Sequence, residues 1–139
     1  MRKQLIIKII VTLLLLSICI ASVLLFNKYV KEKAISKDIG TITIELVDFD
    51  GSKSQKEFSY KEGDSVWSIV KDNYQVKYSE TQFGIMITEI DGIITDFTTT
   101  YIAIYVNDEY SNYTVSNIPI KDGLFISFRA TYLWEINWF

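Results

Sequence analysis

FGIMITEIDGIITDF, residues 83–97, carries the local signal that decides the fold of this sequence. Two apolar segments are separated by Asp91 and Gly92, and an Asp-Gly pair in that setting is typical of a β-hairpin with a type I′ turn. Glycine supplies the positive φ that this turn needs. We therefore predict two paired strands, with Asp91 and Gly92 as a structural turn rather than a binding site.

A hairpin and a short helix are predicted before this stretch. Residues 41–47 alternate apolar and polar side chains, as a half-buried strand does, and residues 56–60 supply its partner. Residues 61–72 place apolar side chains at helical spacing, with Asp64 or Ser65 as the N-cap. The chain therefore changes from strand to helix once before the Asp-Gly turn.

Further strands are predicted after the turn. Residues 101–107 alternate again, and residues 118–129 contain a closing strand that follows a structural turn at Asp122 and Gly123. A hairpin, one helix and then more strands is the order of a β-grasp, in which each layer buries the apolar face of the other. We predict an α+β fold over residues 40–130, with a β-grasp-like mixed sheet packed on one short helix.

The N-terminal region predicts a single transmembrane helix over residues 9–26. These eighteen residues carry no charge, and as a helix they span about 27 Å, close to the thickness of a bilayer core. A cleaved signal peptide, a lipoprotein signal ending at Cys19 and a retained signal anchor are the three alternatives. Bulky Ile18 before Cys19, and the apolar residues that follow Ala21 and Ser22, favour the retained anchor.

The anchor divides the chain into a predicted cytoplasmic N-terminus (1–8), a basic linker (27–39) and an exported domain. Basic residues flank the span on both sides, so the charge distribution does not decide the orientation. An N-terminal anchor followed by one small domain is most simply exported. We expect a single-pass cell-membrane protein whose C-terminal domain is extracytoplasmic, in a bacterium by its composition.

Charge and residue content argue against several functions. Residues 39–139 hold seven basic and fifteen acidic side chains, a net charge of −8, which disfavours nucleic-acid binding. The chain has no histidine, and Cys19 lies in the span, so thiol catalysis and thiolate zinc binding are not expected. Asp48 and Asp50 are better explained by a solvated turn than by calcium. We predict no enzyme activity, no metal and no resident cofactor.

The best candidate site is a group of aromatic residues in and after the strand at residues 101–107. Alternation places Tyr101, Tyr105 and Asn107 on one face of that strand, and Tyr110 follows closely. Tyrosine combines a flat apolar ring with a hydroxyl and suits ligand recognition. The alternative is that these rings form ordinary cross-strand pairs on a sheet surface.

Four segments in order resemble the transcobalamin-like C-terminal domain family, a β-grasp group related to soluble ligand-binding β-grasp domains. They are EGDSV (62–66), GIMITEIDGI (84–93), IYVN (104–107) and KDG (121–123). The resemblance implies a small-molecule ligand, with cobalamin as one candidate, and a partner such as a transporter. The alternative is a surface protein-interaction or structural module with no small ligand.

The sequence departs from the family pattern near the candidate site. Ile102 stands where the family often has tryptophan, the expected Asn-Gly turn is Asn107-Asp108, and residues 111–116 lack an expected glycine. The flat aromatic face that would suit a corrin ring is thereby partly lost. The aromatic tail, residues 131–139 with Trp134, Trp138 and Phe139, could anchor at the membrane interface, bind a partner or cover a sheet edge. An additional strand that covers a sheet edge is the favoured alternative.

Overall fold

The computed structural model describes residues 1–135 and divides the chain between Glu32 and Lys33 into two compact units. The first is most of helix α1 (Arg2–Ala34), and the second contains all of the strands. The predicted tail residues Trp138 and Phe139 lie outside the described residues.

Helix α1 is long and apolar enough to cross a membrane. Both a signal anchor and a signal peptide contain such an apolar helix near the N-terminus. Ala34 is the only buried residue of α1. The helix extends beyond the predicted span through most of the predicted linker. Residues 35–39 belong to the second unit. The backbone of Ser36 fixes them there, because its carbonyl accepts a hydrogen bond from the Gly63 N–H and its N–H donates to the Asp64 carbonyl.

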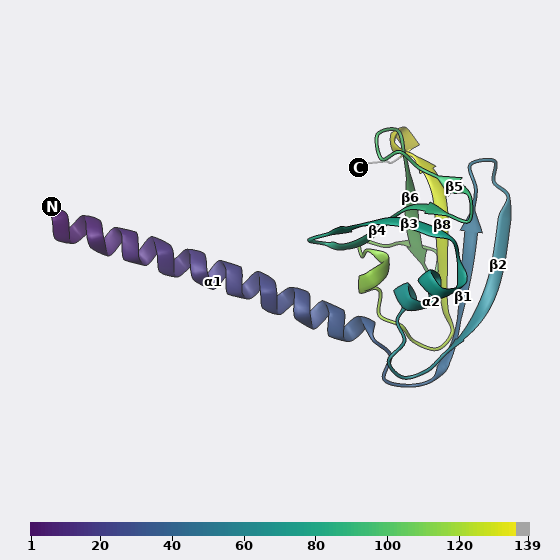
Figure 1. The fold of residues 1–139 in the computed structure, drawn as a ribbon, viewed down its shortest axis with the longest axis horizontal. Helices are drawn as coiled ribbons and strands as arrows, with labels where there is room; N and C mark the ends of the chain where they lie inside the picture. Colours follow the sequence, from purple (N-terminus) through teal and green to yellow (C-terminus); the bar gives the residue numbers. More distant parts are fainter. Residues whose placement is uncertain (136–139) are drawn as a thin grey trace. The chain divides into compact units, whose positions relative to one another are not determined.

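A five-stranded mixed sheet forms one layer of the second unit (Figure 1). Its central strands pair in parallel, while the other neighbouring strands pair antiparallel. In spatial order the strands are β2 (Lys53–Tyr60), β1 (Gly40–Val47), β8 (Leu124–Tyr132), β6 (Thr100–Val106) and β7 (Glu109–Tyr110).

The opposite layer consists of a smaller sheet, one α-helix and a turn of 3-10 helix. The antiparallel sheet has the order β3 (Val76–Thr81), β4 (Gly84–Ile90) and β5 (Ile93–Ile94). Beside it lie helix α2 (Val66–Asn73) and the 3-10 helix η1 (Val115–Asn117). A second 3-10 turn, η2 (Leu133–Glu135), follows β8.

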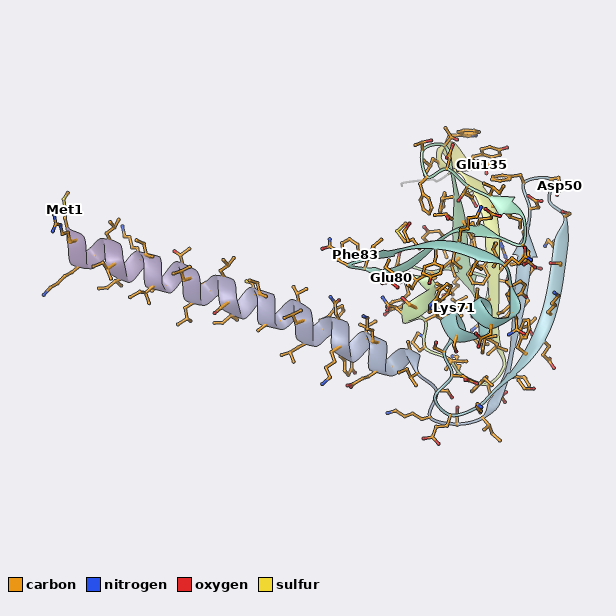
Figure 2. The ribbon with its side chains drawn as sticks, viewed as in Figure 1. Met1, Asp50, Lys71, Glu80, Phe83 and Glu135 are labelled. Carbon is orange, nitrogen blue, oxygen red and sulfur yellow. The ribbon has the colours of Figure 1, made fainter. Side chains whose placement is uncertain are left out.

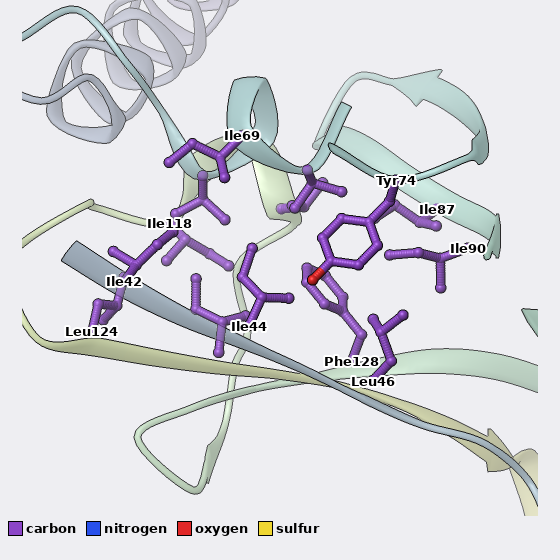
Figure 3. Packing of buried hydrophobic residues seen from close by; sticks show 14 of the residues in the cluster. Ile42, Ile44, Leu46, Ile69, Tyr74, Ile87, Ile90, Ile118, Leu124 and Phe128 are labelled. Carbon is purple, nitrogen blue, oxygen red and sulfur yellow. The ribbon is translucent and has the colours of Figure 1, made fainter. Parts of the chain in front are cut away.

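The hydrophobic core lies between these two layers (Figure 3). Alternate residues of β1 and β8 are almost fully buried, as the period of two in a half-buried strand requires. They meet apolar side chains from α2, from the smaller sheet and from the segment around η1. The principal members are Ile42, Ile44, Leu46, Leu124, Ile126, Phe128, Val66, Ile69, Val70, Tyr74, Ile87, Ile90 and Ile118.

The predicted turns are confirmed. Asp91 and Gly92 have φ values of 44° and 85° and join β4 to β5, as a type I′ turn requires. The Asp91 carboxylate also accepts a hydrogen bond from the Gln75 N–H at 2.8 Å and so fixes the start of the preceding hairpin. At the other predicted turn, Gly123 has φ 77° and Asp122 accepts the Thr41 N–H.

The predicted helix is confirmed as α2. Ser65 is its N-cap, and a reciprocal pair of hydrogen bonds with Ser68 forms a capping box. Val66, Ile69 and Val70 are the buried face. The α+β class with one short helix on a β-grasp-like arrangement is therefore observed.

Two details differ from the sequence prediction. The strands form two sheets rather than one, because β3, β4 and β5 make no hydrogen bonds to the larger sheet. The start of the tail does not form a separate edge strand. Thr131 and Tyr132 continue central strand β8 opposite Tyr101 and Thr100, and the chain then turns into η2.

Candidate ligand-binding groove

A half-open groove lies where strand β4 faces strand β6. It is a cavity of about 260 Å³, and none of its lining side chains carries a charge. We call it the β4–β6 groove. Its lining residues are Ile85, Met86, Ile87, Phe97, Tyr101, Ile102, Ile104, Tyr110, Ser111, Asn112, Tyr113 and Thr114.

The groove exists because its two long walls belong to different sheets. Strands β4 and β6 are not hydrogen-bonded to each other, so their side chains, rather than backbone ladders, fill the space between them. Ile102 and Ile104 pack against the core and also line the groove, while Ile85 and Ile87 face them from β4. The groove is thus an apolar extension of the core that opens to solvent.

One end of the groove is formed by a loop built around Asp96. The Asp96 carboxylate accepts hydrogen bonds from the backbone N–H groups of Thr98, Thr99 and Thr100 at 2.8 to 3.0 Å. It also accepts from two threonine hydroxyls. The Thr99 contacts are the largest cause that holds the pKa of Asp96 below its ordinary value, so the carboxylate remains charged.

This loop holds Phe97 in an unusual conformation at the groove. Phe97 has φ 58°, in the left-handed region that L-residues rarely occupy. Its N–H donates to the Thr100 carbonyl at 2.9 Å, and its side chain remains 37% exposed. The Asp96 network therefore stabilises a strained backbone that presents an aromatic ring to the groove.

The opposite side of the groove is formed by residues 110–114, which are fastened to the tip of the β3–β4 hairpin. The Phe83 carbonyl accepts hydrogen bonds from the Thr114 hydroxyl and the Asn117 amide, and the Ile85 N–H donates to the Ser116 hydroxyl. Phe83 itself projects from the hairpin tip and is 71% exposed (Figure 2). These bonds fix the position of the segment that carries Tyr110 and Tyr113.

Of the four predicted ligand-binding residues, Tyr101 and Tyr110 line this groove. Burial raises the pKa of Tyr101, and interaction with the side chain of Tyr110 acts in the same direction. The Tyr101 hydroxyl therefore remains a neutral donor and acceptor at physiological pH. These two side chains, together with the polar side chains of residues 111–114, supply hydrogen-bonding groups in a mainly apolar cavity.

The other two predicted residues, Tyr105 and Asn107, lie outside the β4–β6 groove. The Arg129 guanidinium lies over the Tyr105 ring, 4.1 Å from its centroid, and the Tyr110 ring contacts it edge to face. Asn107, with φ 50°, exchanges hydrogen bonds with the backbone of Phe125. Asn107 also borders a second cavity, of about 530 Å³, next to Tyr110 and Pro119.

No group of three or more His, Cys, Asp or Glu side chains placed to hold a metal ion occurs within residues 1–135. Asp48 and Asp50 instead accept backbone hydrogen bonds in the turn between β1 and β2, from Phe49 and Ser52. Both carboxylates are therefore engaged by the turn itself.

The sequence prediction missed most of the groove-lining residues. Ile102 and Ile104 pack against the core, and the groove that they border depends on a strand that is distant in the sequence. A usable signal was present at Asp96, since aspartate followed by a run of threonines is typical of a side-chain-capped turn. That signal would have marked the loop, although not the position of Phe97 beside β4.

The fold places this domain in the β-grasp-like class of α+β domains. Residues 63–131 match the model of a family described as a domain of unknown function, DUF4430. The chain therefore carries a domain of this family, the transcobalamin-like C-terminal domain family. None of the curated proteins matches the chain in sequence.

Two solved structures share the fold. A protein from Ruminococcus gnavus, provisionally described as metal binding, superposes with a TM-score of 0.61 at 18% identity, over 67% of this chain and 97% of that one. Haptocorrin in complex with Cbi superposes with a TM-score of 0.60 at 13% identity, over 70% of this chain. This chain spans only 26% of haptocorrin. At these identities the likeness concerns the fold.

Proposed function

We propose that this protein is a membrane-tethered, extracytoplasmic domain that binds a small molecule non-covalently in the β4–β6 groove. The observation that carries the proposal is the groove itself, an uncharged and mainly apolar cavity with tyrosine and other polar side chains in its lining. Ligand sites in proteins typically combine apolar walls with a few convergent polar groups in this way. The apolar helix α1 supplies the tether in this proposal.

The size of the groove limits what it can enclose. Its volume of about 260 Å³ is just below the range of roughly 300 to 1,000 Å³ usual for drug-sized ligands. A small molecule, or one part of a larger one, fits such a cavity. Cobalamin is larger, so the groove would contact it along one edge only, and a partner such as a transporter would cover the rest.

Titration of the full-length chain in detergent micelles or nanodiscs tests this proposal. Cobalamin and a panel of vitamins, cofactors and metabolites are added, and binding is followed by thermal shift and calorimetry. We expect at least one compound to bind saturably. Failure of the whole panel at millimolar concentration would contradict the proposal and favour a protein-interaction module instead.

Two variants locate the bound compound. Tyr110 is 53% exposed, so Tyr110→Ala removes a groove side chain at little cost to the core, and we expect at least a tenfold loss of affinity. Ile94→Ala is the matched control, because Ile94 is 65% exposed on the same domain and does not line the groove. Equal affinities for the two variants would place the ligand elsewhere.

A further inference from the structure

Strand β6 leaves part of its backbone unpaired at the groove. On one side β6 pairs with β8 from Thr100 to Val106, whereas on the other it pairs with β7 only at Tyr105 and Val106. No strand within residues 1–135 pairs with the rest of this second edge. The unpaired part of the edge is the part that borders the groove.

The register identifies which backbone groups face this edge. The Ile104 carbonyl accepts a hydrogen bond from the Ser111 N–H, which lies on the β7 side. Because alternate residues of an antiparallel strand direct their N–H and C=O groups to the same side, Ile102 faces this edge too. Within the described residues, no hydrogen bond occupies the Ile104 N–H or the N–H and C=O of Ile102.

Both ends of this unpaired edge are closed. At one end Thr100 is satisfied within the loop, since its N–H donates to Asp96 and its carbonyl accepts from Phe97. At the other end Ser111 occupies the Ile104 carbonyl. The open edge therefore offers two donors and one acceptor. One or two residues of an added strand could bond to all three groups.

Because the open edge offers both donors and an acceptor, it favours a neutral peptide backbone over an anion as its binding partner. Two N–H donors alone would suit a carboxylate. Here the Ile102 carbonyl lies between the Ile102 N–H and the Ile104 N–H, and its oxygen would repel a carboxylate. Asp96 and Glu109 directly precede the lining residues Phe97 and Tyr110 in the chain, and residues 39–139 carry a net charge of −8, which also disfavours anions. One residue of an extended peptide directs its N–H and its C=O, which belong to two successive amides, to the same side, so it can donate to the Ile102 carbonyl and accept from the Ile104 N–H at the same time.

We propose that the β4–β6 groove binds a short extended peptide that adds to β6 as an extra strand. The peptide bonds to Ile102 and Ile104 through its backbone and places apolar side chains against Met86 and Tyr113. This is the chemistry of strand addition, in which backbone hydrogen bonds supply affinity and side-chain pockets supply specificity. The inference rests on the proposed function and names the ligand class of that site.

Amide hydrogen exchange on the full-length chain in micelles tests the unpaired edge without any ligand. Ala103 and Tyr105 bond to β8, so their amides should exchange at least a hundredfold more slowly than those of Ile102 and Ile104. Equal protection of all four amides would overturn the proposal, because the edge would then already be paired.

Binding is tested with the blocked pentapeptide acetyl-Thr-Leu-Thr-Leu-Thr-amide and a set of analogues, each N-methylated at one amide. We expect the parent peptide to slow exchange at Ile102 and Ile104 at least tenfold, and at least one analogue to lose tenfold or more in affinity. Met86→Glu should weaken binding by a similar factor, whereas Ile94→Glu should not.

The other outcomes separate this inference from the proposed function. If a compound of the metabolite panel binds in the groove but the pentapeptide does not, strand addition is wrong and the small-molecule function stands. If no N-methylated analogue is weakened, backbone pairing is wrong. If protection at Ile102 rises with protein concentration alone, the edge pairs two copies of the chain, and the peptide proposal is overturned.

Discussion

Single residues with positive φ fix both the hairpin turn and the groove. Asp91 combines a left-handed backbone with a carboxylate that holds the Gln75 N–H, and its own N–H donates to the Gln75 carbonyl. Phe97 takes the same backbone region without glycine, because Asp96 fixes the residues after it. In both places an aspartate side chain determines the path of the backbone.

Asp91→Ala should lower the free energy of unfolding by about 2 kcal/mol, because alanine is strained at this φ and leaves the Gln75 N–H without its acceptor. Asp91→Asn should cost less than about 1 kcal/mol, since asparagine tolerates this conformation and keeps an amide oxygen. Urea unfolding of the three proteins measures the difference. Equal losses for the two variants would show that the side-chain hydrogen bond contributes nothing.

The Asp96 loop should loosen in acid. Hydrogen bonds, chiefly those from Thr99, lower the pKa of the Asp96 carboxyl in the folded state. The charged carboxylate therefore contributes its full stabilisation only at a pH above the pKa of aspartate in the unfolded chain, which is about 3.9. That contribution is lost as the pH falls below this value toward the folded-state pKa. We expect the amides of residues 97–100 to lose protection progressively below about pH 4 in the wild type.

Asp96→Asn should remove this acid dependence and show weaker protection of the same amides at neutral pH. Asp50→Asn is the matched control, because Asp50 also has a lowered pKa, through Ser52, but lies in a different turn. Protection that is independent of pH in the wild type would show that Asp96 does not maintain the loop.

At the scale of elements, the β3–β4 hairpin and the η1 segment are packed together through Gly84. Gly84 has φ +122°, and a Cβ there would collide with the hydroxyls of Thr114 and Ser116. The absence of a side chain thus lets the hairpin dock on the segment that carries one wall of the groove.

Gly84→Ala should cost about 3 kcal/mol or more, because it combines backbone strain with a steric clash. Gly51→Ala provides the comparison: Gly51 also has a positive φ, +81°, but nothing lies within 4 Å of its added Cβ. We expect Gly51→Ala to cost only about 1 kcal/mol. Similar unfolding midpoints for the two variants in urea would contradict the packing role of Gly84.

Elements with local signals were predictable from the sequence, and pairings between distant segments were not. Asp91-Gly92, Ser65 and Asp122-Gly123 each specify their own turn or cap through neighbouring residues. The separation into two sheets depends on which distant strands meet β6, and no local pattern encodes that. Tyr105 was a reasonable site candidate by alternation, but Arg129, which is distant in sequence, covers its ring.

At the scale of the whole molecule, the two units have separate physical roles. The hydrophobic core lies entirely in the second unit, and helix α1 contributes only Ala34 to buried positions. The large apolar side chains of α1 between Leu5 and Phe26 are exposed. Such a surface is typical of a helix that is long and apolar enough to cross a membrane, as in a signal anchor or a signal peptide.

Residues 33–139 expressed alone should fold, and their urea midpoint should agree with that of the full chain in micelles, since no core residue is lost. Near-ultraviolet circular dichroism and urea titration measure this. A midpoint shifted by several molar units of urea would show that the helix supports the domain.

The proposal that α1 is a retained anchor makes a separate prediction for the cell. Full-length protein should sediment with membranes and keep its intact mass of 16.1 kDa. The basic linker should be accessible to protease added outside the cell membrane. A shorter soluble product with a new N-terminus after Ala21 would establish cleavage instead.

The parallel pairing of β1 with β8 also has a consequence for how the domain is made. Ile42 lies opposite Leu124, so the centre of the sheet joins two segments that are far apart in the chain. Contacts of such long sequence separation form late and slowly. A nascent chain interrupted before Leu124 lacks β8, the strand that joins the β1–β2 pair to β6 and β7. Its exposed apolar strands then become a target for quality-control proteases.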